Sequence, residues 1–97
     1  MSNRTLRERV LLKLATVIDP AMGTDVLRMR LVEDLQVEEE TGALSYKFRP
    51  SSPLCPMAVT LTLAIRDALA EVEGVSKQDI EVVGYVGADE LNALLRE

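Results

Sequence analysis

The spacing of apolar residues predicts a helix near the start of the chain, from about Thr5 to Val17. Apolar side chains recur at helical intervals through this segment. Thr5 and Glu8 form a capping-box pattern, in which the Thr5 hydroxyl bonds the Glu8 N–H and Glu8 reaches back. The helix must end before Asp19, because a residue that precedes proline avoids helical dihedrals. In the loop that follows, Gly23 is free to adopt a positive φ.

Two segments further along alternate between apolar and polar residues, as half-buried strands do. The first segment, 31–38, places apolar residues on one face and interrupts that face once with an acid: Leu31, Leu35 and Val37, with Glu33. The second segment, 44–49, alternates without interruption. A Thr41-Gly42 turn lies between them, which predicts a β-hairpin. Its polar side should face water and its other side should be covered by helices.

The second half of the chain predicts a helix, a strand and a short helix. A broad apolar stripe predicts the second helix over Pro56 to about Val72, and Gly74 suits the position after its C-terminus. Ile80–Val86 predicts a third strand, and Asp89 can cap a last helix that runs to Arg96. The order helix, strand, strand, helix, strand, helix, with helices on one face of the sheet, predicts a two-layer α+β fold. The length of 97 residues fits one domain, 1–97.

Composition narrows the classes of function. The net charge of -5 argues against nucleic acid as the main partner, because phosphate backbones attract basic surfaces. No apolar run approaches the roughly 20 residues that a membrane span needs, and no apolar segment of a secretory signal follows Met1–Arg4. A single cysteine cannot form an internal disulfide, which agrees with a reducing compartment. We therefore expect a cytoplasmic protein that has no membrane partner.

Cys55 is the residue most suited to chemistry. It lies where the strand pattern stops and the second helical pattern begins. Pro56 suits the first helical position, because its fixed φ fits the helix and its missing N–H would have no partner there. Cys55 is therefore predicted to be the N-cap, with its sulfur near free N–H groups and the positive end of the helix dipole. Such a setting favours the thiolate, the form that binds metal or attacks electrophiles.

Three segments, taken in order, resemble a known family. Residues 17–26 read V-I-D-P-A-M-G-T-D-V, similar to the family pattern V-x-D-P-E-L-G-x-D-I. Residues 29–32 read M-R-L-V, similar to L-G-L-V, and residues 51–58 read S-S-P-L-C-P-M-A, similar to T-T-P-G-C-P-L-A. Because the spacing and the order of elements also fit from about Val10 to Val83, the chain resembles the metal–sulfur cluster biosynthetic family. That family includes SufT-like and PaaD-like proteins.

The resemblance implies a small mixed sheet covered by helices on one face. It also implies a non-enzymatic role in the assembly or delivery of iron–sulfur clusters or the maturation of metal–sulfur proteins, with assembly proteins or apo clients as partners. Cys55 would be the key residue and the metal ligand. In such proteins the Asp-Pro loop lies close to the cysteine loop, so the implied site comprises Asp19, Ser51, Ser52 and Cys55, with Thr24 and Asp25 as weaker members.

Three positions depart from the family pattern. Ala21 stands where the family has glutamate, and Arg30 and Leu54 stand where it has glycine. We expect Leu54 to stiffen or re-aim the cysteine loop, because glycine allows backbone shapes that leucine avoids. The chain therefore resembles a divergent member of the family, in which the cysteine is retained but several of the surrounding motif residues are replaced.

Several alternatives remain open. A cluster usually takes four ligands, mostly cysteine thiolates, so a cluster on Cys55 would be transient and shared with a second copy in a homodimer, a client or a small thiol. Absence of histidine from the chain argues against a cysteine enzyme and against zinc. A lone cysteine is also commonly a small buried residue. Asp19 can be a turn former, and Ser51 and Ser52 can satisfy loop backbone groups. The same fold could instead serve as an adaptor or an accessory subunit, for example of an oxygenase complex, that holds no cluster.

Overall fold

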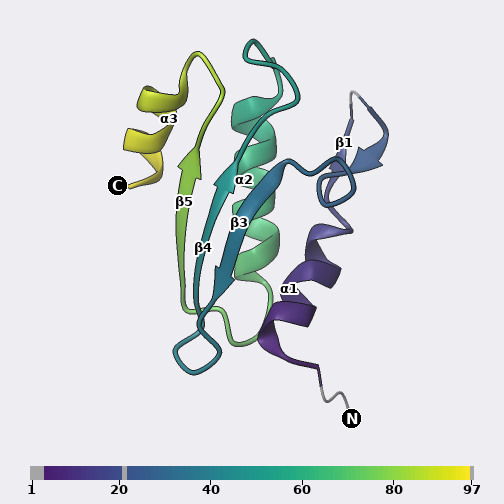
Figure 1. Cartoon of the computed structure of the whole chain (residues 1–97), viewed down its shortest axis with the longest axis vertical. Coiled ribbons are helices and arrows are strands. Elements are labelled where there is room, and N and C mark those ends of the chain that lie inside the picture. The colour runs from purple at the N-terminus through teal and green to yellow at the C-terminus, as the bar shows by residue number, and fades with distance from the viewer. Residues whose placement is uncertain (1–3, 21, 97) are drawn as a thin grey trace.

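The computed structural model describes residues 4–20 and 22–96. Its helices and strands, in chain order, are α1 (Leu6–Leu14), β1 (Ile18–Asp19), β2 (Thr24–Asp25), β3 (Val32–Val37), β4 (Ala43–Phe48), α2 (Ala58–Ala70), β5 (Lys77–Val82) and α3 (Ala88–Leu95). The sheet β3-β4-β5 forms one layer, α1 and α2 lie against one of its faces, and α3 lies beside β5 (Figure 1). Within the described residues, no helix is long and apolar enough to cross a membrane.

The main sheet is mixed, as predicted. β3 and β4 form an antiparallel hairpin, whereas β4 and β5 pair in parallel. Parallel neighbours need a crossover connection, and α2 supplies it by running back along the covered face of the sheet. The predicted two-layer α+β fold and the predicted order of the larger elements are therefore confirmed.

A second, two-stranded sheet was not predicted. Ile18 pairs with Asp25 and Asp19 with Thr24, which turns the expected loop after α1 into a tight hairpin. Strands of two residues are too short to leave an alternating pattern in the sequence. Gly23 has φ +68 in this hairpin, as its position after the Asp-Pro turn predicted.

A β-bulge in β3 corrects the predicted face of that strand. Val32 lies opposite Phe48 and Val37 opposite Leu44, but the register shifts between Glu33 and Gln36. Leu31, Leu35 and Val37 lie in or against the core, as predicted, and the extra residue brings Val32 to the same side. Glu33 therefore does not interrupt the covered face, because it lies opposite Lys47 on the polar side.

The core is aliphatic and is built from one face of each element. α1 and α2 contribute apolar side chains at helical spacing, and β4 and β5 contribute every second residue; the buried set includes Leu6, Val10, Leu14, Leu44, Tyr46, Phe48, Leu61, Ile65, Leu69, Ile80 and Val82. Each fully buried side chain of this size contributes roughly 1.5–3 kcal/mol. The Tyr46 hydroxyl donates to Gln78 Oε1 at 2.8 Å. Burial raises the pKa of Tyr46 above its usual range, and the nearby Arg66 charge opposes this only in part.

Several predicted boundaries shift. α1 ends at Leu14 rather than Val17, and α2 ends at Ala70, so Gly74 lies in the next turn and not at the position just after the helix. β5 is Lys77–Val82 rather than Ile80–Val86, because the chain leaves the sheet at Gly84, whose φ is +64. α3 begins after Gly87, and Asp89 lies inside it. Asn92 of α3 accepts from Val82 N at 2.7 Å and donates to Val82 O at 3.0 Å, which ties α3 to the edge of the sheet.

Arg30 stands in a backbone conformation that suits glycine, since its φ is 60. This conformation accounts for the glycine that the family pattern L-G-L-V has at the position of Arg30. Arg30→Gly should therefore raise the free energy of unfolding by about 0.5–1 kcal/mol, because release of the left-handed strain outweighs the greater freedom of the unfolded chain. Arg30→Ala keeps the strain and should leave stability nearly unchanged. Urea denaturation of both variants measures the difference, and a glycine variant less stable than wild type would contradict it.

Candidate functional site

Cys55 lies in the loop 49–57, which connects β4 to α2. The prediction that it is the N-cap of the second helix is wrong, because α2 begins at Ala58 and its N-cap is Met57. Two successive turns precede the helix: Cys55 N donates to Ser52 O at 3.1 Å, and Ala58 N donates to Cys55 O at 3.3 Å. Pro56 therefore lies in a turn rather than at the first helical position. The side chain of Cys55 is only 7% exposed and packs with the hydrophobic core.

Ser51 and Ser52 are exposed on the same loop. Ser52 Oγ accepts from Leu54 N at 3.2 Å, so this hydroxyl satisfies a loop N–H, which was one of the two predicted alternatives. Leu54 is not strained: among the described residues, the non-glycine residues with positive φ are Arg30 and Asp34. The family's glycine is thus replaced by an apolar side chain that is 74% exposed at the surface of the loop.

Asp19 occupies the end of β1 and is almost completely buried, at 1% exposure. Its backbone carbonyl accepts from Met22 N at 3.2 Å and from Gly23 N at 2.7 Å, so its backbone closes the turn. Asp25, one of the weaker candidates, accepts from Arg28 N at 2.8 Å through its carboxylate. Thr24 pairs with Asp19 in the hairpin. The departure at Ala21 lies outside the described residues.

Three segments gather at the end of the molecule where α2 begins (Figure 1). We call this the cysteine end; it comprises the β1–β2 hairpin (18–25), the loop 49–57 and the loop 83–87. Val86 N donates to Pro53 O at 3.0 Å, which joins the two loops, and Arg49 N donates to Leu31 O at 2.7 Å. The structure therefore brings the predicted residues of both motifs to one end, with Ser51 and Ser52 exposed and Asp19 and Cys55 buried.

Arg49 was not among the predicted site residues, yet it spans the sheet at the cysteine end. Its Nε lies 3.0 Å from Glu33 Oε2 on β3. On the other side its guanidinium fills the space over Gly84, where an added Cβ would lie 2.6 Å from Arg49 Nη1. Because Arg49 simply continues the polar alternation of β4, its place in the sequence does not single it out. The signal that could have pointed to this contact is Gly84, the glycine that follows β5.

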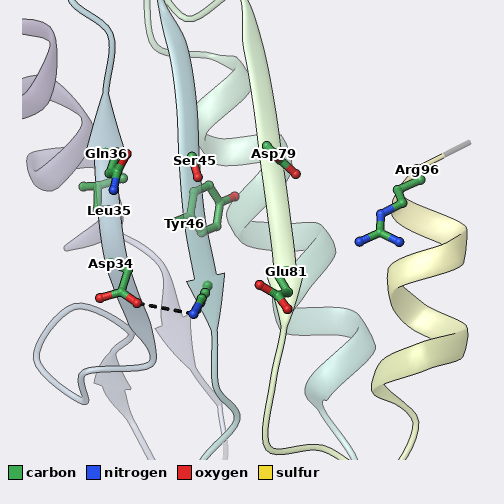
Figure 2. A pocket seen from close by; sticks show the side chains of 9 residues that line it. Asp34, Leu35, Gln36, Ser45, Tyr46, Asp79, Glu81 and Arg96 are labelled. Atoms are coloured by element: carbon green, nitrogen blue, oxygen red, sulfur yellow. Dashed lines mark ion pairs between the residues drawn. The ribbon is translucent and has the colours of Figure 1, made fainter.

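The open face of the sheet carries a polar hollow of about 500 Å³. Its lining combines both charges: Asp34, Leu35, Gln36, Ser45, Tyr46, Lys47, Asp79, Glu81 and Arg96. In Figure 2 the guanidinium of Arg96 points toward β5, on which Asp79 and Glu81 lie, while Lys47 Nζ lies 3.6 Å from Asp34 Oδ2. None of the four main predicted site residues lines this hollow. Among the described residues, no group of three or more cysteine or carboxylate side chains is arranged to hold a metal ion.

Comparison with known proteins agrees with the resemblance seen in the sequence. The model of a family described as "Iron-sulfur cluster assembly protein" matches residues 7–82. An uncharacterised protein of Methanocaldococcus jannaschii is 34% identical over 94% of this chain and 95% of its own length. The Fe-S protein maturation auxiliary factor YitW of Bacillus subtilis is 28% identical over 80% of this chain and 76% of its own length.

The fold has relatives of known structure as well. A domain of unknown function from Bacillus anthracis superposes with a TM-score of 0.72 at 26% identity, covering 80% of this chain and 74% of that one. On the strength of the family match over most of its length, the chain belongs to the iron-sulfur cluster assembly protein family.

Proposed function

We propose that this protein is a non-enzymatic factor in the assembly or delivery of iron–sulfur clusters, or in the maturation of the proteins that carry them. Membership of the family is the observation that supports this most strongly. A relative that covers 80% of the chain is named an Fe-S protein maturation auxiliary factor. The partners would then be iron–sulfur assembly proteins or apo client proteins that dock on the cysteine end.

In this proposal Cys55 handles the cluster, which is cargo and not a resident cofactor. The chain has one cysteine and no histidine, so it offers a single thiolate where a cluster usually takes four ligands. The site must therefore be shared, with the other thiolates supplied by a second chain or a small thiol. Asp19, Ser51 and Ser52 are the proposed oxygen donors nearby. Because Cys55 is 7% exposed, the loop 49–57 must move before its sulfur can reach a cluster.

A second candidate function is an adaptor or accessory subunit that binds partners and holds no cluster. The burial of Cys55 among core side chains is the observation that favours it. In that function the cysteine is a packing residue, and the exposed residues of the cysteine end make the contacts. The two candidates share the fold and the partner class, and they differ in whether the sulfur binds iron.

Anaerobic reconstitution with iron, sulfide and glutathione separates the two candidates. If Cys55 is a ligand, wild-type protein should develop the visible absorbance of a cluster, and Cys55→Ser should lose all of it. Ser45→Ala, on the open face of the sheet, is the matched control and should retain the wild-type signal. If wild type and Cys55→Ser take up iron and sulfide equally, cluster handling by Cys55 is wrong and the adaptor function remains.

A further inference from the structure

The main sheet has two outer strands, and their outer edges differ in how they are covered. At β3, Arg7 of α1 donates through Nη1 to the backbone carbonyl of Leu35 at 3.0 Å, and the bulge interrupts the strand. At β5, the side chain of Asn92 holds both backbone groups of Val82. In Figure 1, α3 lies beside the C-terminal end of β5, and no described element lies along the outer edge of its N-terminal part. The open stretch of edge is therefore the first part of β5.

Strand geometry identifies the backbone groups that this edge presents. In a parallel pair, successive residues of a strand direct their N–H and C=O groups to opposite edges. Val83 N donates to the last residue of β4 at 2.9 Å, whereas both groups of Val82 point outward to α3. Two and four residues before Val82 lie Ile80 and Gln78, so their backbone groups also point outward. The hydrogen bonds of the described residues occupy none of these outward groups of Ile80 and Gln78.

Both faces of the sheet can receive side chains beside this open edge. On the helix-covered face, a hollow of about 310 Å³ lies between α2 and the start of β5, and its lining includes Ala70 and Val75. On the open face, Asp79 and Glu81 belong to the lining of the 500 Å³ hollow. Successive side chains of a strand point to opposite faces. A strand added at this edge would therefore direct one set of side chains toward the first hollow and the other set toward the two carboxylates.

The open side of β5 carries negative charge that the protein itself leaves available. Neither Asp79 nor Glu81 is part of an ion pair with a described basic side chain. Lys47 lies opposite Glu81 in the register, but its ammonium is paired with Asp34 at 3.6 Å. The guanidinium of Arg96 points toward β5 (Figure 2), and its single charge offsets the two carboxylates only in part. A basic side chain on the same face of an added strand would complement this surface.

We propose that the edge of β5 at Gln78 and Ile80 binds an extended segment of a partner protein as an additional strand, with basic side chains toward Asp79 and Glu81. Main-chain hydrogen bonds to the outward groups of β5 provide the affinity, and the alternate side chains provide the specificity. Charge complementarity identifies the occupant as a basic segment, since the acidic side chains of a second β5 would repel those of the first.

This inference goes beyond the proposed function and does not rest on it. β5 begins at the end of the molecule opposite the cysteine end, so a partner can bind here while the cysteine end remains accessible (Figure 1). α3 sets the limit of the site, because Asn92 occupies the backbone groups of Val82. The family model matches residues 7–82, so the helix that limits the site lies outside the matched segment.

Amide hydrogen exchange followed by NMR tests both the edge and its occupant. The probe is a seven-residue peptide of alternating lysine and valine, blocked at both ends. In the free protein, the N–H groups of Gln78 and Ile80 should exchange at least roughly 10-fold faster than those of Asp79 and Glu81, which face β4. Peptide at millimolar concentration should slow Gln78 and Ile80 at least roughly 10-fold. If these two amides are already protected in the free protein, or are not protected by the peptide, the proposal is wrong.

N-methylation of the peptide separates strand addition from attraction between charges. One peptide is methylated at every valine nitrogen and another at every lysine nitrogen of the main chain, so both keep all their charges. Only one of these sets can direct its N–H groups toward β5. One methylated peptide should therefore bind at least roughly 10-fold more weakly than the other, as measured by fluorescence anisotropy of labelled peptide. Equal binding of the two would show that no main-chain pairing occurs and would overturn the proposal.

Charge reversal tests the basic character of the partner segment. Glu81→Lys should weaken binding of the lysine–valine peptide at least about 3-fold at low salt and favour a glutamate–valine peptide. Glu73→Lys is the matched control, because Glu73 is also exposed but its backbone carbonyl accepts from Arg9 of α1, away from the open face. Circular dichroism verifies that both variants fold. Equal effects of the two reversals would show attraction to the net charge of the chain alone and would contradict a basic partner at this edge. None of these measurements involves iron.

Discussion

Replacing Gly42 with alanine is expected to lower the free energy of unfolding by about 3 kcal/mol or more, a large part of the stability of a domain of this size. Gly42 has φ +80, and a Cβ built on it would lie 1.9 Å from the carbonyl oxygen of Gly74. The Gly74 oxygen is a backbone atom and the new Cβ is fixed directly to the backbone, so neither can move aside by changing a rotamer. The left-handed conformation adds roughly 1–2 kcal/mol for any residue with a side chain.

The position of Gly42 explains why the effect should be global. Its carbonyl accepts from Ser76 N at 2.9 Å, and Ser76 Oγ donates to Thr41 O at 2.6 Å. These bonds fasten the hairpin turn to the connection between α2 and β5. They immediately precede the parallel register of Ala43 with Lys77, so pushing the two segments apart disturbs the pairing of β4 with β5 along its length.

Gly23→Ala is the matched control for this substitution. Gly23 also has a positive φ, but no heavy atom lies within 4 Å of the Cβ that it would gain. Gly23→Ala should therefore lower the free energy of unfolding only by the cost of holding alanine in a left-handed conformation, about 1 kcal/mol. Urea denaturation of both variants, with the midpoint and slope compared, separates the cost of the left-handed backbone from the cost of the clash with Gly74. Equal losses would show that the contact between Gly42 and Gly74 carries no additional free energy.

The Cys55 thiol is expected to react with a thiol-labelling reagent roughly 100-fold more slowly than an exposed cysteine at the neighbouring position. Cys55 is 7% exposed and lies in the core, whereas position 54 is 74% exposed on the same loop. A reagent must wait for the loop 49–57 to open before it can reach the buried sulfur. A 100-fold reduction corresponds to an opening free energy of about 2.7 kcal/mol at 25 °C.

Leu54→Cys in the Cys55→Ala background supplies the exposed reference thiol, and the reaction is followed by the absorbance of the released chromophore. Addition of denaturant below the unfolding transition should leave the reference rate unchanged and accelerate Cys55. If Cys55 in the native protein reacts as fast as the reference thiol, its sulfur is reachable without loop motion. In that case burial would no longer favour the adaptor over cluster handling.

Much of the architecture follows from local patterns. The capping pair Thr5 and Glu8 forms as predicted, with Glu8 N donating to Thr5 Oγ1 at 3.2 Å. The alternation in β4 predicted which of its side chains are buried, because successive residues of a regular strand face opposite sides. The bulge in β3 was not predictable in this way, because it depends on Asp34 adopting φ 52 where β3 pairs with β4, and simple alternation carries no sign of an extra residue.

By itself the sequence determined the mixed α+β architecture, the family and the identity of the residues to consider, since helical and strand periodicities and the order of three motifs are properties of neighbouring positions. Tertiary structure alone decided that α2 begins after Cys55, that this sulfur and Asp19 are buried, and that Leu54 and Val86 are exposed on two loops joined by a hydrogen bond. The physical reason is that burial depends on the side chains that other segments bring to a residue. The turns at Ser52 and Cys55 and the hydrogen bond from Val86 to Pro53 position those segments through backbone groups, which every residue type shares.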